Sequence, residues 1–395
     1  MEWIQKIRFA IHCVRGAHSF AKRTLSVTLL IFYLATITPA TLLSQEVKTT
    51  EIEFRTKRVD RNTIGEVLVE DPQGNIVLLT PDGRLWPLHA EEIVSREETV
   101  ESMKPLSQDE IFAKIKEELP QGVSVIRKKH YVIVYNSTRD YANYVGAQFE
   151  LVYKNFRNYW WSHHRIRLEE PRFPLVALVF RDRNSYLKYA VPDVGKQTAE
   201  QTIGYYNQES NLMVTYNINA QQGAGLKSAE RNLATIVHEA VHQMAYNSGL
   251  QVRLADNPRW LSEGLAMFFE SPTMRQVRGK VTITWKMGEV NRHNLFKFRQ
   301  AKSQRLIKPG TLNLLVANDD WFLSNGEVSY PYSWALTYFL MKKNKESFSK
   351  YVQELAEYPT LNAVPEPQRV AVFKKHFGED LAGLEIEMVK YISAL

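Results

Sequence analysis

The chain has 395 residues, of which 44% are hydrophobic and 24% charged, a composition typical of globular proteins and long enough for two or three domains. The formal net charge is +7, but residues 1–40 alone carry a net +4, which leaves +3 for the rest. That balance is too small to favour nucleic acid as a partner. The single cysteine, Cys13, excludes a fold held together by intramolecular disulfides.

Residues 1–44 have the pattern of a targeting segment. A basic leader precedes an uncharged stretch, residues 24–45, with "LLIFYLATI" at its centre and small residues near Ala40 and Ser44. This order is typical of a secretory signal peptide. The same stretch is long enough to span a bilayer if it is not cleaved, so membrane anchoring is the alternative. Both readings predict a secreted or cell-envelope protein.

Residues 51–97 are expected to form a small β module. "GEVLVE", "NIVLLT" and "GRLWPL" are short strand-like runs, separated by "DPQG" and "TPDG", which carry the residues that tight turns require. We interpret the module as a meander that closes into an SH3-like barrel. Residues 98–110 are polar and charged with one proline, and we predict a linker there.

Residues 111–395 are expected to form a second domain that mixes helices and strands. "RDYANYVGAQFELVYKNFRNYWW" has aromatic and aliphatic residues at helical spacing, "FPLVALVF" is typical of a buried strand, and "GYYNQESNLMVTYN" is typical of a hairpin. Helical patterns dominate after residue 228. The predicted fold class is therefore α+β.

The stretch "ATIVHEAVHQMAY", residues 234–246, carries the strongest chemical signal. Ser228 is a predicted N-cap, and residues 247–249 can end the helix. His238 and His242 are four residues apart, so both imidazoles project from one helix face and can reach one Zn²⁺. Glu239 lies one residue further around the helix, where it can reach a water activated by the metal. Two surface histidines on an ordinary amphipathic helix are the alternative.

A catalytic zinc needs a third protein ligand. The continuation HExxHxxGxxH fails, because Ala245 and Ser248 occupy the positions of its glycine and its third histidine. "NPRWLSEGLAMFFES" instead offers Glu263 in an otherwise apolar helix, where an unpaired carboxylate would be costly. Glu270, two turns further on the same face, is the second choice. It could equally be a solvated carboxylate at the helix end.

Three motifs, "HEAVH", "WLSEGLAMFFE" and "YPYSWALTYFL", together resemble the gluzincin zinc peptidases, the thermolysin-like group. They more closely resemble an exported bacterial family of unknown function with a peptidase-MA-like C-terminal domain, over roughly residues 125–395. The resemblance implies a zincin-like fold: a small sheet packed on the active-site helix, followed by a helical C-terminal lobe. It also implies that His238, His242 and Glu263 bind zinc, with Glu239 as general base. The "GAMEN" type of stretch that marks gluzincin aminopeptidases is missing from this sequence.

The segment "SYPYSWALTYFL" offers two tyrosines, Tyr330 and Tyr332, just before a predicted amphipathic helix. A neutral tyrosine hydroxyl can donate a hydrogen bond to the oxyanion that forms as water attacks a carbonyl. The resemblance selects the tyrosine four residues before Trp334, which is Tyr330. The alternative is that both rings only pack against Trp334.

These observations predict an exported zinc metallopeptidase that acts on a peptide or protein substrate. Residues 211–217 could offer a strand edge to an extended substrate. Two other hypotheses remain open. One is a non-catalytic envelope protein that uses the β module to bind a partner, with a peptidase-like scaffold behind it. The other is a zinc hydrolase acting on a non-peptide amide.

The leader predicts that the exported protein begins shortly after Ala40 or Ser44. Amino-terminal sequencing of the protein purified from its native envelope or medium tests this. A membrane-bound chain that begins at Met1 would instead favour the anchor.

Overall fold

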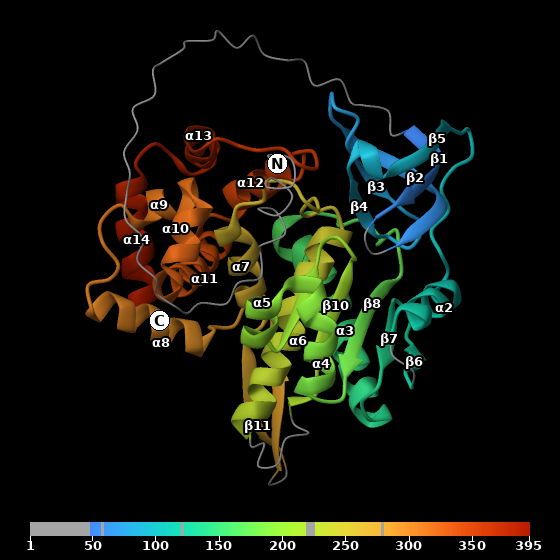
Figure 1. Cartoon of the computed structure of the whole chain (residues 1–395). Coiled ribbons are helices and arrows are strands. Elements are labelled where there is room, and N and C mark those ends of the chain that lie inside the picture. The colour runs from blue at the N-terminus through green and yellow to red at the C-terminus, as the bar shows by residue number, and fades with distance from the viewer. Residues whose placement is uncertain (1–47, 57–58, 120–121, 219–225, 278–279) are drawn as a thin grey trace.

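The computed structural model of the protein describes residues 48–56, 59–119, 122–218, 226–277 and 280–395 (Figure 1). The predicted leader lies outside these residues. In the described part of the chain, no helix is both long and apolar enough to cross a membrane. The chain folds into an N-terminal β region, a central sheet with helices on both faces, and a helical C-terminal part, so the α+β prediction is confirmed.

The N-terminal β region is a five-stranded antiparallel sheet with two more strands than predicted. Its pairing order is β4-β3-β2-β1-β5. The two predicted turns are present, and each ends on a glycine with positive φ, Gly74 and Gly83. Strand β1, between β2 and β5, alternates exposed charged residues with buried Ile52 and Phe54, and these charges weaken the apolar pattern in the sequence. The strands are β1 (Lys48–Arg55), β2 (Asp60–Glu70), β3 (Ile76–Leu79), β4 (Leu85–Leu88) and β5 (Ile93–Glu98).

The segment that follows the sheet is only partly a linker. Helix α2 (Gln108–Glu118) begins inside the predicted linker, where Ser107 and Glu110 form a reciprocal capping box. Met103 is buried in an apolar cluster that also contains Phe173 of the following region. This cluster includes buried residues of β3 and β4, so it attaches the β region to the rest of the molecule.

The central sheet has the order β6-β7-β8-β10-β9, with β7, β8 and β10 parallel to one another and the two outer strands antiparallel to their neighbours. The predicted hairpin is therefore confirmed. However, β10 is paired on both sides, so the expectation that residues 211–217 offer a free edge is wrong. The edge strand is β9. The strands are β6 (Ser124–Arg127), β7 (Tyr131–Tyr135), β8 (Leu175–Phe180), β9 (Gly204–Asn207) and β10 (Leu212–Tyr216).

Helices cover both faces of this sheet because its strands are apolar on both sides. On one face, α3 (Arg139–Tyr159) and α6 (Leu226–Asn247) pack on alternate residues of β7 and β8. On the other face, α2, α4 (Arg183–Val194) and α5 (Lys196–Gln201) contribute to a second apolar cluster. Strands with this continuous burial are typical of a sheet between two helical layers.

The C-terminal part is a helical lobe that packs on α6 through α7. Helices α7 and α11 approach closely at Gly264, where an added Cβ would lie 2.8 Å from the Ser333 carbonyl oxygen. A two-stranded hairpin, β11 (Pro272–Val277) and β12 (Lys280–Trp285), follows α7. The helices are α7 (Arg259–Phe269), α8 (Arg292–Ser303), α9 (Thr311–Ala317), α10 (Asp319–Ser324), α11 (Gly326–Lys343), α12 (Lys345–Leu355), α13 (Glu366–Phe377) and α14 (Leu381–Ser393).

Candidate metal centre

Helix α6 carries both histidines of the motif and is fixed to the central sheet. Its side chain Gln243 donates to the carbonyl oxygens of Val176 (3.1 Å) and Asn211 (3.0 Å). The helix begins at Leu226, two residues before Ser228, so Ser228 lies inside the first turn and is not the N-cap. It ends at Asn247 as predicted, followed by Gly249 with a φ of +74°.

The structure brings His238, His242 and Glu263 together. Potential ligand atoms of the three side chains all lie within 4.8 Å of one another. The two Nε2 atoms are 3.2 Å apart, and the Glu263 carboxylate oxygens lie 3.4 Å from the Nε2 of His238 and 3.9 Å from that of His242. Two turns of α6 and one turn of α7 thus converge on one point.

The donor set fits a zinc ion. Two imidazoles and one carboxylate are a ligand combination of catalytic zinc sites, which keep a further position open. Glu263 is only 4% exposed on a helix whose other residues are also buried, so its charge needs a partner. The facing Nε2 atoms of His238 and His242 can share at most one hydrogen bond, whereas a cation would use both lone pairs.

Glu270 lies on the opposite side of His238. Its Oε2 is 2.6 Å from the Nδ1 of His238, and its Oε1 accepts a hydrogen bond from Asn291 at 3.0 Å. The side chain is 16% exposed, so it is neither the solvated carboxylate considered above nor a member of the three-residue cluster. A carboxylate on the second nitrogen fixes the tautomer and ring orientation of a metal-binding histidine. The i, i+7 spacing from Glu263 is the sequence signal that places both carboxylates on one helix face.

The two histidines differ in their affinity for protons. Burial lowers the pKa of His242 to about 4, so this ring is neutral and offers a lone pair. Burial also opposes protonation of His238, but Glu270 and Glu263 outweigh it and raise the pKa of His238 well above its usual value. Metal binding therefore has to displace a proton from His238, and the affinity should fall as the pH falls.

Glu239 is directed away from the three-residue cluster and towards the sheet. Its Oε2 accepts the backbone N–H of Tyr206 in β9 at 2.8 Å, and the residue is 6% exposed. Burial, with a contribution from Glu263, raises the pKa of Glu239 to about 7. A buried carboxylate with this pKa can take up and release a proton near neutral pH.

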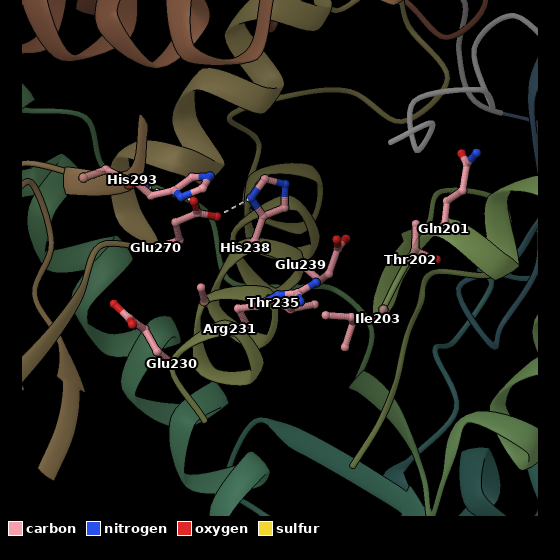
Figure 2. A pocket seen from close by; sticks show the side chains of 13 residues that line it. Gln201, Thr202, Ile203, Glu230, Arg231, Thr235, His238, Glu239, Glu270 and His293 are labelled. Atoms are coloured by element: carbon pink, nitrogen blue, oxygen red, sulfur yellow. Dashed lines mark hydrogen bonds and ion pairs between the residues drawn. The ribbon is translucent and has the colours of Figure 1, made fainter. Parts of the chain in front are cut away.

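His238 and Glu239 line one pocket of about 480 Å³ (Figure 2). Its floor is one face of the N-terminal half of α6, and one wall is the segment that leads into β9. Glu270, Asn291 and His293 lie on the other side. The lining residues are Gln201, Thr202, Ile203, Gly204, Glu230, Arg231, Ala234, Thr235, His238, Glu239, Glu270, Asn291 and His293.

The two tyrosines lie elsewhere. They are inside α11, which begins at Gly326, and not in a segment before it. Tyr332 is fully buried and donates to Glu385 at 2.6 Å. Tyr330 packs edge-on against Phe322, with ring centroids 4.9 Å apart, and lines a neighbouring cavity of about 420 Å³. Neither tyrosine is among the residues that line the pocket of His238.

His293 lines both cavities and was missed by the sequence reasoning. Asn291 caps α8 by accepting the Asn294 backbone N–H at 3.1 Å, and the same side chain donates to Glu270. His293, the second residue of α8, is thereby positioned beside Glu270 at the pocket wall (Figure 2). No local motif marks this histidine, because only the tertiary packing of α8 brings it to the pocket that His238 lines.

Residues 232–362, about a third of the chain, match a family described as a protein of unknown function (DUF1570). The match includes the three cluster residues, Glu239 and Glu270, and it leaves out the β region and the central sheet. No protein with a curated description matches the chain.

The convergence of the three side chains predicts about one zinc per chain. Elemental analysis of purified protein should show loss of the metal in His238→Ala and in His242→Ala, since each removes a ligand. His163→Ala removes an exposed histidine and is the matched control. Stoichiometric zinc in both cluster variants would refute the assignment.

Glu270→Gln should weaken zinc binding by roughly 10- to 100-fold, because the amide cannot hold His238 as a carboxylate does. The fold should be retained, since the amide keeps the size of the side chain. Competition with a chromophoric chelator measures the affinity, and circular dichroism checks the fold. An unchanged affinity would show that Glu270 does not support the metal site.

Proposed function

We propose that this chain is an exported zinc-dependent peptidase. One observation carries the proposal: His238 of the three-residue cluster and the buried Glu239 line the same pocket, beside the edge strand β9 of the central sheet. A structural metal site would be closed by four protein ligands, whereas this cluster offers three.

The residues of the site would have different roles in the reaction. His238, His242 and Glu263 would hold the metal, and Glu270 would orient His238. When bound, Zn²⁺ acts as a Lewis acid that polarises a carbonyl group and makes water more acidic. The apolar surroundings of Glu263 exclude bulk water from the back of the site, which strengthens the electrostatic interactions there.

Glu239 would be the general base. Its pKa of about 7 allows it to accept a proton from the attacking water and to pass that proton to the leaving amine. The N–H of Tyr206 holds one carboxylate oxygen, so the side chain keeps its orientation while the proton moves.

The edge strand β9 favours a peptide as the substrate. The Tyr206 N–H bonds to Glu239 and not to β10, so it lies on the outer edge of β9. Residues two apart in a strand direct their backbone groups to the same edge, so Gly204 presents its groups there too. Gly204 lines the pocket. An extended peptide could therefore pair with this short edge by strand addition.

The second candidate is the non-catalytic envelope protein. In that case the β region would bind a partner, and the three-residue cluster would only stabilise the fold. A non-peptide amide is the other alternative substrate. The position of the buried Glu239 in the pocket lining and its raised pKa favour a reaction over a purely structural role.

Glu239→Gln should keep fold and zinc but abolish hydrolysis, because an amide cannot accept the proton. The amide oxygen can still accept the Tyr206 N–H, so β9 should stay in place. Digestion of a proteome-derived peptide library, with zinc content measured in parallel, tests this. Cleavage at the wild-type rate would move the general base to another residue.

Two residues, Tyr330 and His293, are candidates for the donor of a hydrogen bond to the oxyanion. Tyr330 is the residue chosen by resemblance, whereas His293 lines the pocket that contains His238 and Glu239. The geometry favours His293, so His293→Ala should lower turnover by about 10²-fold, the usual loss for one oxyanion donor. Tyr330→Phe should change turnover by less than about threefold on that same scale. A large loss in Tyr330→Phe with little change in His293→Ala would return the role to Tyr330.

A further inference from the structure

Arg231 lies in line with the two histidines of the cluster. Residues 231, 235, 238 and 242 have spacings of i, i+4, i+7 and i+11, which place them along one face of α6. Seven residues of helix correspond to a rise of about 10 Å, so Arg231 lies that far from His238 towards the start of α6. Both residues line the same pocket, and Thr235 lies between them (Figure 2).

The guanidinium of Arg231 has no carboxylate partner. The side chain is exposed, and among the described residues no Asp or Glu lies within ion-pair distance of it. Its electrostatic neighbour is the buried Tyr216. Burial raises the pKa of Tyr216, and the guanidiniums of Arg183 and Arg231 act in the opposite direction. Arg183 donates to the Glu200 carbonyl oxygen and, in the described part of the chain, also lacks an ion pair with a carboxylate.

Glu230 is the one acidic residue at this end of the pocket lining. It is adjacent to Arg231 in the chain and therefore about 100° further around the helix, at the margin of the face that carries the histidines. It does not form an ion pair with Arg231 in the described structure. Arg183 does not line the pocket, so the lining holds one guanidinium and one carboxylate at this end, and these two groups do not pair with each other in the described structure.

We propose that Arg231 forms a carboxylate-binding subsite, so that the enzyme prefers peptides with a carboxylate about three residues from the bond that is cut. The estimate takes the backbone spacing along the helix: Arg231 and His238 are about 10 Å apart along α6, which corresponds to three residues of extended peptide at about 3.3 Å each. Arginine suits this role, because its planar fork pairs with a carboxylate through two hydrogen bonds. The carboxylate can belong to an Asp or Glu side chain or to the carboxyl terminus of the peptide. This subsite rests on the proposed peptidase function.

Peptide binding to the full-length Glu239→Gln variant tests the subsite without hydrolysis. The probes are alanine-based octapeptides with an amino-terminal fluorophore, measured by fluorescence anisotropy. One series has a carboxyl-terminal amide and a single Asp placed at each position in turn. A free-acid form without Asp and a neutral amide form complete the set. The Asp series reports side-chain recognition, and the free acid reports recognition of the carboxyl terminus.

We expect one Asp position or the free acid to bind roughly tenfold more tightly than the neutral amide, the scale of a charge-assisted hydrogen bond. Adding Arg231→Gln should remove this gain, and the gain should also shrink as the salt concentration rises. Adding Glu230→Gln should increase the affinity for acidic peptides, because it removes a repulsive charge. Arg292→Gln is the matched control: this arginine is exposed on α8, does not line the pocket, and its loss should leave the preference unchanged.

Equal binding of all peptides, or an acidic preference that survives Arg231→Gln, would overturn the subsite. Loss of binding in Glu230→Gln with no effect of Arg231→Gln would also overturn it. Library digestion by the wild-type protein distinguishes failure of the subsite from failure of the proposed peptidase function. Cleavage without an acidic preference would refute the subsite alone. An Arg231-dependent preference without any cleavage would refute the peptidase and retain the subsite.

Discussion

The site depends on His238 being held between two carboxylates of one helix. Its Nδ1 lies 2.6 Å from Glu270 and its Nε2 lies 3.4 Å from Glu263, and both glutamates belong to α7 or its C-terminal end. Because α6 packs on the central sheet and α7 packs on α11, this contact joins the two halves of the molecule. The same arrangement requires α7 to be buried along its whole length, which makes Glu263 costly unless a cation compensates its charge.

A second set of contacts fixes the wall opposite α7. The Tyr206 N–H in β9 donates to Glu239. The N-terminal β region contacts the turn that follows β9. The Leu85 N–H donates to the Glu209 carbonyl oxygen at 2.7 Å, and Arg253 donates to the carbonyl oxygen of Gly83 at 2.7 Å. The N-terminal β region therefore contacts the hairpin whose edge strand faces the pocket. In this arrangement the β region supports the site as part of the same packed structure.

The sequence was most informative where local spacing decides the outcome. The i, i+4 histidines and the apolar helix around Glu263 were enough to predict the cluster, and the turn residues predicted the hairpins. Prediction failed where tertiary pairing decides: β10 was expected to have a free edge, which β9 covers, and Ser228 was expected to cap a helix that begins earlier. His293 could not be found from local pattern, because α8 reaches the pocket only through Asn291 and Glu270.

The central claim is that one metal ion binds between α6 and α7. Anomalous diffraction from crystals of the zinc-loaded protein, recorded on both sides of the zinc absorption edge, tests it most directly. The account predicts a single strong zinc peak among the Nε2 atoms of His238 and His242 and the carboxylate of Glu263. Zinc-loaded crystals in which the peak lies at other residues, with these three side chains bonded only to one another, would contradict it.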